Sequence, residues 1–164
     1  MKLLNQVNRW VHNLSGVLLG VMTSLVIAQV FFRYVLSKPL IGSEELARFA
    51  MVWLVMIGAT VVLRNRSHIA VEFFVELCPK AVQKAARILT YLLILVFSWI
   101  LLTEGIHLTE SSMNHLAPAT QIPNGYITLS IPIAGFISIL YMLEAIVLEF
   151  KGKDPTSNEE AVEK

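Results

Sequence analysis

The stretch that decides the fold is residues 92–102, LLILVFSWILL, in which ten of the eleven side chains are strongly apolar. It lies within residues 88–106, a segment about as long as the roughly 20 apolar residues that cross the hydrocarbon core of a bilayer. Three further stretches have the same character, at residues 14–36, 46–63 and 126–150. The sequence therefore predicts an all-α integral membrane protein with four transmembrane helices. Because the second stretch is short, three spanning helices with this segment lying in the membrane interface are the alternative.

The composition agrees with a membrane protein. Of 164 residues, 55% are hydrophobic and 15% are charged, and the mean hydropathy is +0.65. A soluble domain carries about 25% charged residues, so the composition argues against a soluble enzyme or a nucleic-acid-binding module. The net charge of +1 provides no basic field for nucleic acid. The single cysteine, Cys78, can form neither an internal disulfide nor a cysteine metal site.

The distribution of basic residues predicts the orientation. They gather before the first span, between the second and third spans and after the fourth: Lys2, Arg9, Arg64, Arg66, Lys80, Lys84, Arg87, Lys151 and Lys153. The loop at residues 107–125 has no Lys or Arg. Because cytoplasmic loops are enriched in basic residues, both termini are expected in the cytoplasm. We expect one four-helix membrane domain at residues 1–150, whose first span is a retained anchor, and a disordered polar tail at residues 151–164.

Residues 68–84, between the second and third spans, have an amphipathic pattern. Ile69, Phe73 and Leu77 recur at helical spacing, and Glu72 shares a polar stripe with Glu76. This pattern predicts a helix lying in the cytoplasmic membrane interface, with a plain helical linker as the alternative. We assign Arg64, His68 and Glu72 to this cytoplasmic interfacial segment.

A cluster of charges precedes the apolar part of the second span, in GSEELAR at residues 42–48. Ser43 is a good N-cap, and Arg48 lies four residues after Glu44 and three after Glu45, so ion pairs are expected. Two interpretations are open: a capped helix start, or a docking site for another membrane protein. Arg33 is expected at the same level of the membrane. Trp53, too deep for an interface anchor, is expected to pack between helices or against a partner.

Other motifs point away from chemistry in this chain. The ionisable residues Glu104 and Glu144 are expected near helix ends, whereas ion pathways place such groups near the bilayer midplane. The histidines are also expected near helix ends, which does not favour haem ligation. The sequence has no zinc-site spacing, no Walker loop and no GxSxG elbow, so no catalytic, metal or cofactor residues are predicted.

Helix packing within the chain is expected at three glycines: Gly16 and Gly20, which form a GxxxG pair, and Gly58.

Several motifs in this order resemble a known family. They are Arg33-Tyr34, SEELARFAMVWLVMIGA at residues 43–59, RNRSHIAVE at residues 64–72, QIP at residues 121–123 and IPIAGF at residues 131–136. Over about residues 5–150 the chain resembles the small membrane subunit of tripartite ATP-independent periplasmic (TRAP) transporters, the DctQ-like family. The family often has Asp where this chain has Glu72, and Gly where it has Ser67.

The resemblance implies a non-enzymatic scaffold subunit in the bacterial inner membrane. It implies two protein partners: a large elevator-type membrane subunit (DctM-like), which holds the substrate and sodium sites, and a periplasmic substrate-binding protein. Membrane lipids are the remaining expected contact. The cargo implied is an organic acid such as a C4-dicarboxylate or a sialic acid, driven by sodium and not by ATP. A stand-alone homo-oligomeric transporter and a membrane electron-transfer subunit are the alternatives.

Overall fold

The structure is a computed structural model, and it describes residues 2–38, 41–64 and 80–150. The elements are α1 (Lys2–Tyr34), α2 (Ser43–Arg64), α4 (Lys80–Ser112), the single turn α5 (Gly125–Thr128) and α6 (Ser130–Phe150). Within these described ranges, four helical segments are long and apolar enough to cross a membrane: Gln6–Tyr34, Ser43–Arg64, Ala85–Ser112 and Gly125–Leu148. The predicted all-helical fold with four membrane-crossing helices is thus confirmed at this level.

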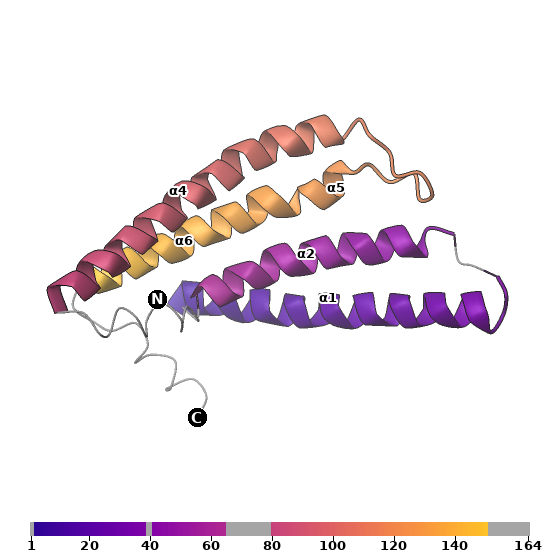
Figure 1. Ribbon diagram of the computed structural model, residues 1–164, viewed down its shortest axis with the longest axis horizontal. Helices are drawn as coiled ribbons and strands as arrows, with labels where there is room; N and C mark the ends of the chain where they lie inside the picture. Colours follow the sequence, from indigo (N-terminus) through magenta and orange to yellow (C-terminus); the bar gives the residue numbers. More distant parts are fainter. Residues whose placement is uncertain (1, 39–40, 65–79, 151–164) are drawn as a thin grey trace, which may run out of the picture.

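The four long helices form a single row in the order α1, α2, α6, α4 (Figure 1). α1 packs on α2, α2 on α6 and α6 on α4, while the short α5 lies against α4. The spans differ in the share of residues that are buried inside the chain, taken over the most apolar part of each span. This share is 0% for α1 and 11% for α4, but 44% for the α5–α6 segment. α1 and α4 are therefore the two edges of the row, and α6 is its most enclosed helix.

Small residues allow α4 and α6 to approach closely. Buried positions recur every seven residues on each helix: Tyr91, Ser98 and Gly105 on α4, and Ala134, Tyr141 and Leu148 on α6. A seven-residue repeat keeps one stripe of a helix facing its neighbour. A Cβ atom added at Gly135 would lie 2.9 Å from the backbone nitrogen of Leu102. The backbones of α4 and α6 are therefore nearly in contact at this point.

The apolar core lies toward one end of the row. It is formed by Tyr91, Tyr141, Met142 and Ala145, with Leu63 of α2 packed against it. We call this the terminal end, because α1 begins and α6 ends there (Figure 1). The opposite end, where the α1–α2 connection and residues 113–124 lie, is called the loop end.

The helices run beyond several of the expected span limits. α1 begins at Lys2 instead of residue 14, and α4 runs from Lys80 to Ser112 instead of residues 88–106. No glycine or proline interrupts residues 106–112, so the helix continues past the last strongly apolar residue. Of the expected interfacial helix, only residues 80–84 are described, where they form the first turns of α4. The rest of it, with His68 and Glu72, and the tail at residues 151–164 lie outside the described residues.

Candidate functional site: polar contacts at the two ends of the row

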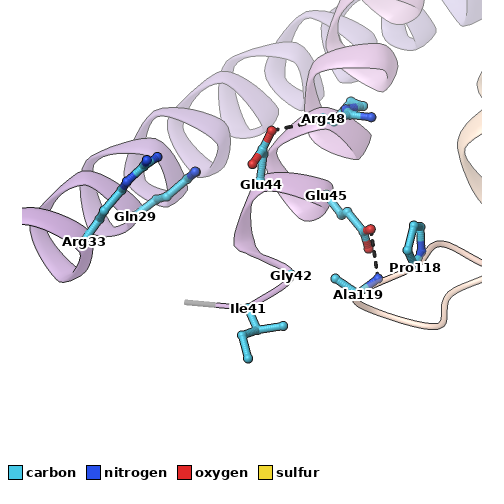
Figure 2. Close-up of a pocket in the computed structure, with 9 residues that line it drawn as sticks. All are labelled: Gln29, Arg33, Ile41, Gly42, Glu44, Glu45, Arg48, Pro118 and Ala119. Atoms are coloured by element: carbon cyan, nitrogen blue, oxygen red, sulfur yellow. Dashed lines mark hydrogen bonds and ion pairs between the residues drawn. The ribbon is translucent and has the colours of Figure 1, made fainter. Parts of the chain in front are cut away.

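Glu45 joins the start of α2 to the loop that precedes α5. Its carboxylate accepts hydrogen bonds from the backbone amides of Ala119 (3.0 Å) and Thr120 (2.8 Å) and from the Thr120 hydroxyl (2.8 Å). Figure 2 shows the Glu45 side chain directed at this loop. The expected ion pair between Glu45 and Arg48 is therefore replaced by a contact between segments more than 70 residues apart.

The loop holds its amides in place through its own backbone bonds. The amide of Ala117 donates to the carbonyl of Ile122 (2.9 Å), and the amide of Asn124 donates to the carbonyl of His115 (2.8 Å). Gln121 closes the turn in the left-handed region, with φ 57°. The turn leaves the amides of residues 119 and 120 free of backbone partners within the loop, so that a carboxylate can accept both of them.

Gly42 lets α2 start directly beside this loop. Its φ of +85° is in the left-handed region, and an added Cβ atom would lie 2.8 Å from Cγ2 of Thr120. A larger residue would be strained in its backbone and would also push against Thr120. The carbonyl of Gly42 then accepts the first helical bond of α2, from the amide of Leu46 (3.0 Å).

The remaining charges of the predicted cluster surround an open hollow at the loop end. Arg48 forms the predicted ion pair with Glu44 at 3.7 Å, and both side chains are mostly exposed. Arg33 and Gln29 extend from α1 on the other side of Glu44 (Figure 2). The hollow has a volume of about 420 Å³ and is lined by Gln29, Arg33, Ile41, Gly42, Glu44, Glu45, Arg48, Pro118 and Ala119. The structure therefore brings the four predicted charges together, but an exposed pair such as Arg48–Glu44 adds little stability.

Trp53 forms a second connection between α2 and the C-terminal helices. Its indole nitrogen Nε1 donates a hydrogen bond to the backbone carbonyl of Tyr126 in α5 (3.0 Å). Pro132 lies six residues after Tyr126. Its ring and its missing amide prevent regular helical hydrogen bonding back to residue 128, close to the break between α5 and α6. Trp53 thus contacts a neighbouring helix of its own chain.

Arg64 forms the connection at the terminal end. Its guanidinium lies 3.6 Å from the carboxylate of Glu144, and the two side chains are only 12% and 14% exposed. The guanidinium carbon also lies 5.1 Å from the centre of the Tyr141 ring, within the range of a cation–π contact. Arg64 was expected in the cytoplasmic interfacial segment, and neither partner was predicted, because nothing in the sequence alone states that α2 and α6 are neighbours.

The glycines at which helices approach closely differ from those expected. A Cβ atom at Gly16, Gly20 or Gly58 would meet nothing within 4 Å, so close packing at these positions is not found within the described part of the chain. Gly105 and Gly135 make the close contacts instead. At Gly105, an added Cβ atom would lie 2.9 Å from Cδ of Pro132. The GxxxG spacing in α1 is not matched by a neighbour here because α1 is an edge helix with one face against α2.

Glu104 lies deeper in the row than the sequence indicated. α4 continues for eight residues beyond it, so it lies about 12 Å inside the end of the helix at about 1.5 Å per residue. The expectation that Glu104 is near a helix end is therefore wrong, since that expectation took the helix to stop at residue 106. Glu104 is exposed on α4.

The geometry indicates a structural role for most of these polar groups. α2 is joined to the loop before α5 through Glu45 at its start, to α5 through Trp53 near its middle, and to α6 through Arg64 at the terminal end. Among the described residues, no group of three or more His, Cys, Asp or Glu side chains could hold a metal ion. The fold and these contacts define a multi-pass α-helical membrane protein whose described polar groups mainly connect its helices.

The comparison with known families specifies this class further. Residues 22–152 match the family described as the DctQ component of tripartite ATP-independent periplasmic transporters. This match covers most of the chain, and the chain belongs to the DctQ family, the small permease subunits of TRAP transporters.

Three relatives show how this family is used. The sialic acid TRAP transporter permease protein SiaT of Haemophilus influenzae is 27% identical over 92% of this chain, which spans only 24% of that protein. The sialic acid TRAP transporter small permease protein SiaQ of Vibrio cholerae is 21% identical over 79% of this chain and 75% of its own length. The C4-dicarboxylate TRAP transporter small permease protein DctQ of Vibrio cholerae is 26% identical over 74% of this chain and 50% of its own length.

Proposed function

We propose that this protein is the non-catalytic scaffold subunit of a sodium-driven TRAP transporter and that it pairs with a large, elevator-type membrane subunit. The observation that carries the proposal is the open row of helices, in which each of the four long helices exposes several large apolar side chains. Contiguous exposed apolar surface in a membrane protein is covered either by lipid or by another membrane protein. An open row of four helices presents far more such surface than a closed bundle of the same length, which suits a subunit that widens a fixed platform.

The contacts of α2 support a rigid platform. The connections through Glu45, Trp53 and Arg64 are spread along α2, so this helix cannot shift along its axis without breaking at least one of them. A stationary subunit needs such fixed helix positions if a neighbouring subunit is to move against it. In this proposal, the sodium and substrate sites lie in the large subunit, and no cofactor is bound by this chain.

The proposed cargo of the assembled transporter is an organic acid, such as a sialic acid or a C4-dicarboxylate, delivered by a periplasmic binding protein. The support is that relatives carry these substrates in their names. The proposed location is the bacterial inner membrane, with both termini in the cytoplasm and the loop end facing the periplasm. The support is the even number of membrane-crossing helices among the described residues, together with the excess of Lys and Arg near the terminal end. The interfacial helix at residues 68–84 belongs to the same proposal.

Affinity purification of the chain from its native membrane, followed by mass spectrometry, tests the pairing. We expect a large polytopic membrane protein at a ratio near one to one. Recovery of the chain alone, or as a homo-oligomer that transports by itself in vesicles, would contradict the proposal.

Orientation is tested by cysteine labelling from each side in a Cys78→Ser background. We expect a new cysteine at Ala119 to be labelled from the periplasm, and labelling from the cytoplasm would reverse the orientation.

A further inference from the structure

Glu104 occupies an unusual place for a carboxylate in a membrane-spanning helix. It shares one face of α4 with Leu93, Phe97, Ile100 and Leu108, all spaced three, four or seven residues apart along the helix. We call these five residues the Glu104 face. Leu93, Phe97 and Ile100 are 63%, 60% and 49% exposed, whereas Ser98 and Gly105 are buried against α6 on another side of α4. The Glu104 face is thus turned away from the rest of the chain.

The depth of Glu104 follows from both ends of the row. Glu45 and Arg64 mark the polar ends of α2 and are nineteen residues apart, about 28 Å, which is close to the thickness of the hydrocarbon core. Tyr91 packs with Tyr141 at the level of Arg64, and Glu104 lies thirteen residues beyond it, about 20 Å. Glu104 is therefore roughly 8 Å or more inside the apolar layer at the loop end.

Exposed hydroxyl groups in the middle of α1 are satisfied within their own helix. On α1, the hydroxyls of Thr23 and Ser24 donate to the carbonyls of Leu19 and Gly20. Lipid can cover such groups without leaving a donor unpaired. The carboxylate of Glu104 has no hydrogen bond or ion pair with any of the described residues, and a helix surface offers a carboxylate no free donor at this depth.

We propose that the Glu104 face is the contact surface for a membrane-spanning helix of the large subunit, and that this helix carries a Lys or Arg at the depth of Glu104. A carboxylate exposed to lipid is expensive, and intramembrane charges are usually paired. A basic side chain on an otherwise apolar helix matches the Glu104 face in both charge and hydrophobicity. This inference rests on the pairing proposed above and adds which face is used and which residue type is opposite.

A second copy of this chain fits the same surface less well. A twofold contact brings identical faces together, so Glu104 of one copy would lie near Glu104 of the other. The five-residue face holds one carboxylate and neither Lys nor Arg, so such a contact would bring two carboxylates together; the nearest basic side chain of α4, His107, lies one turn further toward the loop end. Charge complementarity therefore favours a different chain as the occupant.

The first test leaves Glu104 intact. A photoreactive benzophenone side chain is placed at Phe97 in the chain co-expressed with its large subunit, and the complex is irradiated in native membranes. We expect a crosslink to the large subunit, which peptide mapping should place within about one helical turn of a Lys or Arg. Crosslinks only to lipid, or to a second copy of this chain, would overturn the inference.

The second test changes the charge. Glu104→Lys should lower recovery of the large subunit at least tenfold in an affinity purification, and Glu104→Gln should lower it less. Glu110→Lys is the matched control: Glu110 is exposed on the same helix, close to its end, and this change should alter recovery by less than twofold. Changing the crosslinked base of the large subunit to Glu should restore recovery with Glu104→Lys.

The outcomes separate the two proposals. If the wild-type chain recovers no large subunit, the proposed function fails. If the wild-type chain recovers it but Phe97 gives no crosslink to it, or if Glu104→Lys recovers it as well as the wild type does, only the inference about the Glu104 face fails. Equal amounts of each variant in the membrane fraction show that insertion has not been lost.

Discussion

The substitution Gly135→Ala tests the close packing of α4 on α6. The added methyl group would lie 2.9 Å from the backbone nitrogen of Leu102 and 3.0 Å from the backbone oxygen of Ser98. These neighbours are backbone atoms, so they can move only if the two helices separate. Overpacking of this kind costs about 1–3 kcal/mol. Alanine is also the better helix former by about 1 kcal/mol, which partly offsets the clash.

Gly58→Ala is the matched control, because an added Cβ atom at Gly58 meets nothing within 4 Å. The gain in helix propensity is common to both substitutions and cancels in their difference. Gly135→Ala should therefore have a free energy of unfolding about 1–3 kcal/mol lower than Gly58→Ala. Reversible unfolding of the isolated chain in bicelles, followed by circular dichroism during SDS titration, measures this difference. Equal stability of the two variants would refute the close approach of α4 and α6 at Gly135.

Three further predictions concern the connections of α2. A double-mutant cycle with Arg64→Gln and Glu144→Gln should give a coupling energy of about 0.5–2 kcal/mol in the same unfolding assay, and a value near zero would contradict a stabilising ion pair. Trp53→Phe keeps a ring but removes the donor to Tyr126, and should lower the free energy of unfolding by about 0.5–1.5 kcal/mol; Trp99→Phe, at an exposed position, is the control and should change it less. Glu45→Ala should speed hydrogen exchange of the amides of residues 119 and 120 at least tenfold, as measured by NMR in micelles. Glu44→Ala, which removes an exposed pair, should not, and equal exchange in the two variants would count against the Glu45 contact.

The features that were predicted from the sequence are those set by local order along the chain. Hydropathy alone indicates the four membrane-crossing helices, because their length and apolarity need no knowledge of their neighbours. The ion pair between Glu44 and Arg48 follows from a spacing of four residues on one helix. The gathering of Arg33 with this pair at one end follows from placing span ends at the same membrane level.

The features that were missed depend on which helices are neighbours. The contact of Glu45 with Thr120 and the pair between Arg64 and Glu144 join residues 75 and 80 positions apart. Neither contact has a local signal in the sequence, because many polar residues near other helix ends would be equally good candidates for the partner of Glu45 or Arg64. The glycines show the same limit: GxxxG spacing marks where a helix could approach, whereas Gly135 makes contact because α4 happens to lie beside it.

The single row of helices has a consequence for how this protein can change over evolution. A closed bundle has an interior, and each interior residue must fit several others, so substitutions there are tightly coupled. In the row, much of the surface of α1 meets only lipid or a partner. Lipid tails are as apolar as leucine, so exchanging one apolar side chain for another on a lipid-covered face changes little. Selection on such a face acts on helix length and overall apolarity more than on residue identity. Strict demands remain at the α4–α6 contact and at the polar connections of α2. Such tolerance agrees with identities of only 21–27% between this chain and its relatives.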